Sequence, residues 1–279
     1  MMLRYLVYTF AAIWLIHAFW PSVAHAQQQQ PQHASQCQAI AEAMPQATFA
    51  SFTPVAATKG TAVVGEVAIT YLGHSTFLIE TPGGVSIATD YNGWFAPSAP
   101  PTVATMNKAH SSHYTLTPDP AIKNVLHGWG DNGRPARHDL VVGDTYIRNV
   151  TTDIRAGGGV MEHDGNSIFI FEVADLCIGH LGHLHHELDD SHYRQIGRLD
   201  VLMVPVDGGL TMGAESMSRV VGRLRSSLIL PMHRRGPPID AFLDMFGDDY
   251  DKRFADSTSV KVSLRSLPSK PLIYILKGV

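Results

Sequence analysis

Cysteine is scarce in this chain: its 279 residues include only Cys37 and Cys177. In an oxidising compartment the two could pair, and closing so long a loop would contribute about 4 kcal/mol by the chain-entropy relation. The alternative is a buried strand thiol at Cys177 and a free Cys37, and the sequence leaves both open. Neither cysteine lies in a nucleophile motif, and a Gly-x-Ser-x-Gly elbow is absent. Covalent catalysis by serine or cysteine is therefore disfavoured.

The chain also lacks a Lys/Arg-rich run, and its net charge is only −4 with a pI of about 6.4. These features argue against nucleic acid or an anionic membrane surface as a partner. The glycine run at 157–159 lacks the spacing of a phosphate-binding loop, so it indicates a flexible connection. With 45% hydrophobic residues, the chain can build the core of one large domain.

Only the N-terminus has a long apolar run. Arg4 is followed by a largely apolar stretch at 5–20 and by Ala24-His25-Ala26, a small-x-small cleavage site. We predict a signal peptide at 1–26 and a periplasmic or secreted mature protein. The alternative is an uncleaved anchor, because the run approaches the roughly 17 residues needed to span a bilayer. We expect no stable membrane association after cleavage.

The remaining sequence predicts one domain behind a polar segment. Residues 27–62 form a polar linker and N-terminal segment with a short helix at 36–44, and the domain is predicted at 63–279. Residues 118–139 are a candidate substrate-facing insertion. Strands are predicted at 67–72, 76–80, 85–89, 102–106, 140–150, 167–173, 176–179, 200–206, 228–230 and 271–276, and helices at 187–196, 214–224 and 239–246.

Four apolar runs end in histidine or aspartate. The residues at or just past these ends are Asp90, His110 with His113, His180 with His183, and His233. In open α/β architectures, sites form outside the carboxyl ends of strands. Imidazole is a common ligand of zinc and suits iron, copper and nickel. The pattern therefore predicts a single metal centre.

Several segments, in order, resemble the metallo-β-lactamase superfamily. They are YLGHSTFLIE at 71–80, the strand ending in Asp90, His180-Leu181-Gly182, DVLMVPV with two glycines at 200–209, and Pro231-Met232-His233. The resemblance covers roughly 67–233 and is closest to the ascorbate-phosphate-lactonase-like metallohydrolases. It implies an α/β (α+β) fold, a four-layer αββα sandwich with a metal site at one edge of its two sheets.

The family signature H-x-H-x-D-H is altered in this chain. Its ligand positions fall on Lys108, His110, Ser112 and His113, so lysine and serine replace a histidine and the aspartate. The family's next metal histidine falls near Asp153. Its metal-bridging aspartate falls on His183, and its final histidine on His233.

These replacements predict a mononuclear centre. A carboxylate readily bridges two ions, whereas a neutral imidazole has one lone pair, so His183 disfavours a dinuclear site. We expect one divalent ion, zinc with manganese or iron as alternatives, in a nitrogen-rich site. The predicted ligands are His110, His113, His183 and His233. Asp90, His74 and Asp153 are expected either to contact the ligands without binding the metal or to line the pocket.

The resemblance implies hydrolysis of a small-molecule ester, lactone, amide or phosphodiester by a metal-activated water. Ser112 and His183 occupy positions where the family orients that water, and Lys108, if neutral, or His186 could be the general base. Two alternatives stay open. One is a catalytically silent member that binds a metal or ligand, and the other is a mononuclear iron or copper redox protein.

Overall fold

The computed structural model describes residues 33–38, 65–131, 134–156 and 160–279. Residues His33–Val279 form one compact unit. The predicted signal peptide and most of the polar segment at 27–62 lie outside the described residues. Within the described ranges, no helix has the length and apolarity to cross a membrane.

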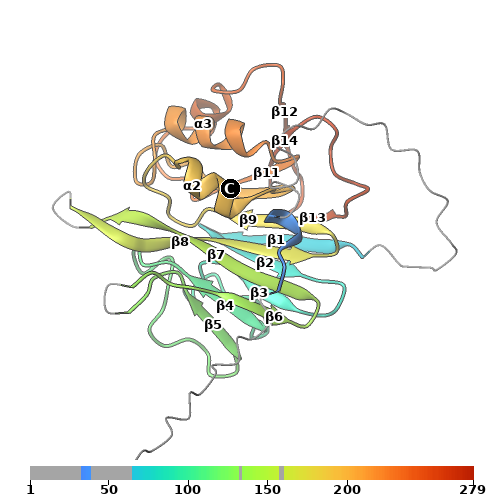
Figure 1. The fold of residues 1–279 in the computed structure, drawn as a ribbon. Helices are drawn as coiled ribbons and strands as arrows, with labels where there is room; N and C mark the ends of the chain where they lie inside the picture. The colour runs from blue at the N-terminus through green and yellow to red at the C-terminus, as the bar shows by residue number, and fades with distance from the viewer. Residues whose placement is uncertain (1–32, 39–64, 132–133, 157–159) are drawn as a thin grey trace, which may run out of the picture. The chain divides into compact units, whose positions relative to one another are not determined.

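The first half of the domain, together with one strand from its C-terminal part, builds a six-stranded mixed sheet (Figure 1). In sheet order the strands are β13 (Ser259–Val262), β1 (Val67–Gly73), β2 (Thr76–Glu80), β3 (Ser86–Ala88), β4 (Val103–Met106) and β5 (Asn124–His127). Strands β1, β2 and β3 run antiparallel, and β3, β4 and β5 run parallel.

The second sheet has eight strands and is also mixed. Its β9, β10, β11, β14 and β12 are parallel, and β6 to β9 are joined by antiparallel pairing. In sheet order the strands are β12 (Asp251–Phe254), β14 (Leu272–Ile275), β11 (Leu228–Met232), β10 (Val201–Pro205), β9 (Leu176–His180), β8 (Met161–Val173), β7 (Thr145–Arg155) and β6 (Asp139–Val142).

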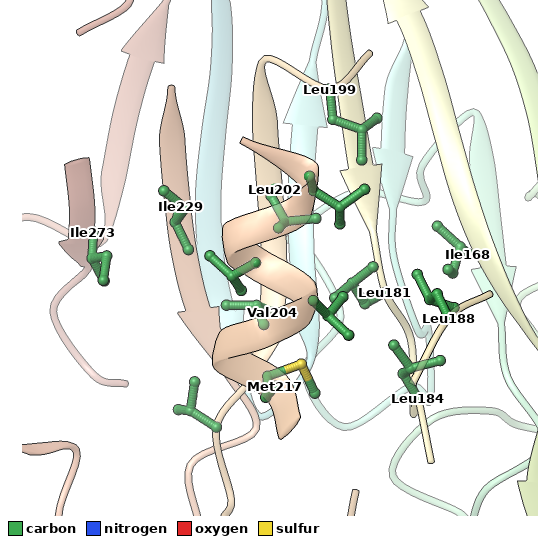
Figure 2. Packing of buried hydrophobic residues seen from close by; sticks show 14 of the residues in the cluster. Ile168, Leu181, Leu184, Leu188, Leu199, Leu202, Val204, Met217, Ile229 and Ile273 are labelled. Carbon is green, nitrogen blue, oxygen red and sulfur yellow. The ribbon is translucent and has the colours of Figure 1, made fainter. Parts of the chain in front are cut away.

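Three helices accompany the parallel part of this sheet. Helix α2 (Asp190–Ile196) connects β9 to β10, α3 (Ala214–Leu224) connects β10 to β11, and α4 (Asp240–Leu243) follows β11. Apolar side chains of α3 recur at helical spacing, at Met217, Val220, Val221 and Leu224, and are buried. This stripe packs on the sheet, as Figure 2 shows for Met217 beside Val204.

Alternation along the strands divides the core into two layers. In β10, Val201 and Met203 belong to the cluster between the sheets, whereas Leu202 and Val204 belong to the cluster under the helices. Successive strand residues face opposite sides of a sheet. A strand that is covered on both faces therefore has a continuous apolar sequence, which is why VLMVP could be predicted as a strand.

Among the described residues, loop side chains pack on the outer face of the six-stranded sheet. Ala104 and Met106 of β4 contact a cluster that includes Tyr91 and Ile122, with Trp129 partly buried against it. The two mixed sheets, with a shared apolar core between them, confirm the predicted α/β sandwich.

Several elements differ from the prediction, and β8, expected at 167–173, already begins at Met161. The strand expected at 140–150 is a hairpin, because Gly143 adopts φ +56° and turns β6 into β7. The irregular insertion expected at 118–139 contains β5. Strands β12 and β13 were not predicted, and all four residues of β12 are exposed. Exposed edge strands lack the apolar alternation from which strands are predicted.

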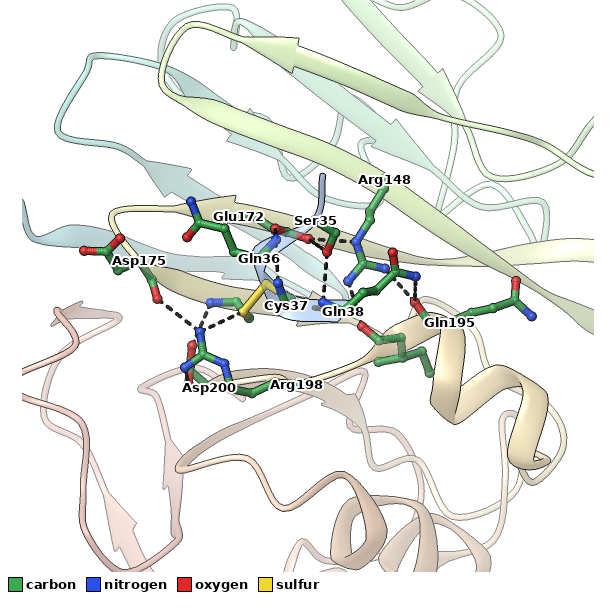
Figure 3. Close-up of a disulfide and its surroundings, with 12 residues drawn as sticks. Ser35, Gln36, Cys37, Gln38, Arg148, Glu172, Asp175, Gln195, Arg198 and Asp200 are labelled. Atoms are coloured by element: carbon green, nitrogen blue, oxygen red, sulfur yellow. Dashed lines mark hydrogen bonds and ion pairs between the residues drawn. A yellow bond between two sulfur atoms is a disulfide. The ribbon is translucent and has the colours of Figure 1, made fainter. Parts of the chain in front are cut away.

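A disulfide joins Cys37 to Cys177, with Cα atoms 6.0 Å apart and 140 residues of separation (Figure 3). Beside it, the Glu172 carboxylate accepts hydrogen bonds from the Gln36 backbone N–H at 2.9 Å and from Arg148 Nε at 2.8 Å. The sequence left open whether the two cysteines pair. In the structure they do, and the pairing fixes residues 33–38 to the eight-stranded sheet.

Candidate metal centre

Four histidines converge at one end of the two sheets. One ring nitrogen from each lies within 4.8 Å of the others. Each residue lies just past the end of a strand: one after β1, two after β4 and one after β11. The members of this four-histidine cluster are His74, His110, His113 and His233. Three of them were predicted as ligands, and His74 was predicted to line the pocket.

His113 is oriented by a buried carboxylate. Its Nδ1 lies 2.6 Å from Asp90 Oδ2, and Asn107 Nδ2 donates to Asp90 Oδ1 at 2.9 Å. Burial alone would raise the pKa of Asp90, but His113, His180 and Asn107 bring it down to about 2. Asp90 is therefore an ionised acceptor beside His113 Nδ1.

His233 has a matching partner that sequence reasoning missed. Its Nδ1 lies 2.9 Å from Asp207 Oδ2, within ion-pair distance but outside hydrogen-bond geometry. Asp207 accepts hydrogen bonds from Thr211 Oγ1 at 2.6 Å and Gly209 N at 2.9 Å. Despite burial, these contacts lower the pKa of Asp207. The signal was available, because Asp207 follows the apolar strand 201–205 just as Asp90 follows its own strand.

The two carboxylates determine which ring nitrogens face the cluster. His113 Nδ1 contacts Asp90 at hydrogen-bond distance, and the Asp207 carboxylate close to His233 Nδ1 favours a hydrogen on that nitrogen too. Each neutral ring then has a bare lone pair on Nε2. The two Nε2 atoms lie 3.1 Å apart. Two lone pairs at that distance repel each other, and a shared cation removes the repulsion. The donor set therefore fits a metal ion.

Ser112 connects the other two members of the cluster. Its Oγ lies 2.8 Å from His74 Nε2 and 2.6 Å from His110 Nδ1. A hydroxyl can donate to one imidazole and accept from the other. Ser112 thus orients two histidines at the position where the resemblance has an aspartate.

Both of these histidines are neutral at physiological pH. Burial, followed by the neighbouring histidines, lowers the pKa of His74 to about 3 and that of His110 to about 4. A metal binds the neutral imidazole, so neither residue needs to lose a proton before binding at pH 7.

His183 lies against the cluster but is not one of its four members. Its ring centroid is 5.0 Å from that of His110, 4.7 Å from that of His113 and 4.8 Å from that of His233. Its Nδ1 contacts His185 Nε2 at 2.7 Å. Its Nε2 is buried and has no hydrogen-bond partner among the described residues. Burial and the neighbouring histidines lower the pKa of His183.

Three other predicted residues have partners outside the cluster. Lys108 forms an ion pair with Glu162. His186 accepts the Asp153 N–H at Nε2 over 3.0 Å, and its Nδ1 contacts the Glu187 carbonyl oxygen at 2.8 Å, so both ring nitrogens are engaged. The Asp153 carboxylate lies 2.9 Å from His163. The structure does not bring Lys108, His186 or Asp153 to the four-histidine cluster.

A cavity of about 200 Å³ borders the cluster. It is open to solvent on one side, and two of its walls come from His110 and His183, so a molecule bound there would lie beside the metal centre. Its lining residues are Ala109, His110, Arg155, His183, His185 and Leu210.

A sequence profile identifies the family of this chain. The profile described as the beta-lactamase superfamily domain matches residues 68–233, more than half of the chain. The chain belongs to the metallo-β-lactamase superfamily. The matched region begins in β1 and ends at His233, and so it contains the whole four-histidine cluster. A comparison with curated proteins finds no match.

Solved structures of the superfamily are similar to this chain. One, named as a candidate zinc-dependent hydrolase of the superfamily from Thermotoga maritima, is 28% identical over 75% of this chain and 98% of its own, with a TM-score of 0.55. A candidate metal-dependent hydrolase from Parabacteroides distasonis is 15% identical over 66% and 90%, with a TM-score of 0.53. At 15% identity the second match shows the fold alone.

Proposed function

We propose that this protein is an exported metal-dependent hydrolase acting on an ester, lactone, amide or phosphodiester bond of a small molecule. The observation that carries the proposal is the pair of Nε2 atoms of His113 and His233, which lie 3.1 Å apart while buried carboxylates contact both Nδ1 atoms. A bound divalent ion would polarise the substrate's carbonyl or phosphoryl oxygen and lower the pKa of a water molecule.

The residues around the cluster have separate roles in this proposal. Asp90 and Asp207 favour one tautomer of His113 and of His233 through their negative charge, and Ser112 fixes the rings of His74 and His110. The bordering cavity, at about 200 Å³, is smaller than most drug-sized ligand sites and suits a small substrate.

A single zinc ion is the proposed metal. Four imidazole nitrogens match the donor type of zinc, and a five-coordinate ion would keep one position for the water molecule. None of the four cluster members is a carboxylate, the group that readily bridges two ions. The name of the Thermotoga maritima structure, which is similar over most of this chain, also mentions zinc. Manganese and iron remain alternatives.

Export is proposed from two features. The N-terminal sequence resembles a signal peptide, and Cys37 forms a disulfide with Cys177. Disulfides persist in oxidising compartments such as the periplasm and are rare in the cytosol. A periplasmic or secreted location would also separate the enzyme from cytoplasmic sugar phosphates, so these compounds are disfavoured as its substrates.

Membership of the ascorbate-phosphate-lactonase-like branch stays a prediction.

Turnover of the zinc-loaded protein tests this function. We would measure hydrolysis of a panel of esters, lactones, amides and phosphodiesters by the parent protein, His110→Ala and His233→Ala. Each variant should lose at least about 10²-fold in kcat/KM on the best substrate, because the metal centre supplies several kcal/mol of transition-state stabilisation.

A matched control is His163→Ala, because this exposed histidine lies outside the cluster. The control should retain the parent rate. A folded, zinc-loaded parent protein that hydrolyses nothing in the panel would contradict the proposal and favour a catalytically silent binding protein. Iron or copper as the native metal, together with oxygen-dependent chemistry, would favour the redox alternative.

A further inference from the structure

Backbone contacts fix the position of His183. Its N–H donates to Asn166 Oδ1 at 2.7 Å. The preceding Gly182 has φ +61°, and a Cβ there would meet both Asn107 Nδ2 and Asn166 Oδ1 at 2.4 Å. Glycine avoids these contacts, and the neighbouring residue His183 is only 3% exposed beside the four-histidine cluster.

The position of the proton on His185 follows from a backbone contact. The Arg155 N–H donates to His185 Nδ1, which must therefore be an unprotonated acceptor. A neutral imidazole with a bare Nδ1 has its hydrogen on Nε2. That Nε2 lies 2.7 Å from His183 Nδ1, so the His185 Nε2–H is the donor of this contact.

The same reasoning gives the tautomer of His183. Because its Nδ1 accepts from His185, its hydrogen is on Nε2. A protonated Nε2 has no lone pair in the ring plane and cannot bind a metal. The reverse orientation would place the Arg155 N–H against a second N–H on His185, which is repulsive. The chain from Arg155 through His185 thus makes His183 a donor at Nε2.

Nothing in the described part of the chain accepts that hydrogen. His183 Nε2 is buried without a hydrogen-bond partner, and the ring lines both the cluster and the adjoining cavity. Buried polar groups normally have partners, and an orphaned donor at a site calls for an explanation. A substrate oxygen at the junction of cavity and cluster would supply the acceptor.

We propose that His183 is a hydrogen-bond donor to the reacting substrate rather than a metal ligand, with its Nε2–H directed at the carbonyl or phosphoryl oxygen on which negative charge develops. The inference rests on the proposed hydrolase function and deepens it. It differs from the ligand role that the sequence predicted for His183. Arg155 and His185 are positioning residues, because they act by fixing the tautomer of His183.

The tautomer can be measured without turnover. Two-bond ¹H–¹⁵N correlation spectra of protein labelled with ¹⁵N-histidine distinguish the two neutral tautomers and a zinc-bound nitrogen. The signal of His183 is assigned by its loss in His183→Gln. We expect Nε2–H in both the chelator-treated and the zinc-loaded protein. An unprotonated Nε2 with the chemical shift of a zinc ligand would overturn the proposal while leaving the hydrolase function intact.

Two variants test the donor role itself. His183→Gln keeps an N–H donor, whereas His183→Leu has a side chain of similar size without one. Both should bind the same amount of zinc as the parent, because His183 is not a ligand. On the best panel substrate, His183→Leu should lose about 10²-fold in kcat, the usual effect of removing one donor to a developing oxyanion, and His183→Gln should recover much of it.

Equal rates in the two variants, or reduced zinc content in His183→Leu, would overturn the inference. Circular dichroism identifies a variant that fails to fold, and the spectra of the unaltered protein then decide the result. Failure of the hydrolase function itself appears separately, as a zinc-loaded parent protein without turnover before any variant is made.

Discussion

At the residue scale, each cluster histidine depends on a second side chain. Asp90 contacts His113, Asp207 contacts His233, and Ser112 lies between the other two rings. Such partners fix ring orientation and tautomer, and they raise the basicity of the ligand. The affinity for metal is therefore expected to depend on residues that never touch the ion.

Replacing Asp90 with Asn tests this dependence. Asn preserves the size of the side chain but removes the negative charge that contacts His113 Nδ1 at 2.6 Å. We expect the zinc affinity to fall by about 10- to 100-fold, measured by competition with a chromophoric chelator. Asp153→Asn is the matched control, because Asp153 contacts His163 outside the cluster. Equal affinities for the two variants would contradict the role given to Asp90.

Acid should destabilise the metal-free protein through His74 and His110. Their pKa values in the fold are about 3 and about 4, below the ordinary value of 6.5. Between those values the unfolded chain binds more protons, so the stability is fully present above pH 6.5 and falls as the pH drops toward 4. Urea unfolding of chelator-treated protein between pH 7 and pH 4 measures this loss.

The double variant His74→Asn with His110→Asn is the control for that experiment. It should unfold with a weaker dependence on pH over the same range, because two groups with lowered pKa values are gone. An unchanged slope would show that other groups account for the acid sensitivity.

At the scale of elements, the site is built from strand ends that are held close together. The turn after β9 is tightly packed, because Gly182 lies against the side chains of Asn107 and Asn166. Asn107 comes from the segment after β4, and Asn166 is in β8. Gly182 therefore packs against side chains from both sheets, next to the metal centre.

Gly182→Ala should lower the free energy of unfolding by about 1–3 kcal/mol, because alanine is strained at positive φ. The added Cβ also has no space, since two side-chain atoms would lie 2.4 Å away. Gly247→Ala is the matched control, because a Cβ there meets nothing within 4 Å. Denaturant unfolding measures both variants, and similar stabilities would contradict the account of the turn.

The elements that were predictable from sequence are those covered on both faces or patterned at helical spacing, such as β10 and α3. Strands β12 and β13 lie at sheet edges, where polar residues are tolerated, so their sequences lack the pattern. In the site, His113 and His233 follow apolar strands and could be found. His74 lies in a turn at φ 54°, and its approach to the other three depends on the packing of the two sheets.

At the scale of the whole molecule, the disulfide connects sequence positions that no local pattern relates. Residues 33–38 reach the eight-stranded sheet through Cys37 and through hydrogen bonds to Glu172. The sequence could place both cysteines but not their distance, because the Cα separation of 6.0 Å is a property of the folded chain.

Cys37→Ser with Cys177→Ser should lower the free energy of unfolding by about 4–5 kcal/mol, as expected for a loop of 140 residues under the chain-entropy relation. The comparison is denaturant unfolding of parent and double variant with and without reductant. The parent should be destabilised by reductant and the double variant should not respond. A parent protein that is insensitive to reduction would contradict the contribution assigned to the disulfide.

The central claim is that four histidines hold one divalent ion. The most direct test is the metal content per chain of untagged protein, measured by mass spectrometry, for the parent and for His113→Ala. We predict about one zinc per parent chain and almost none in the variant. Two ions per chain would contradict the mononuclear centre, and an absence of metal after reconstitution would contradict the metal site itself.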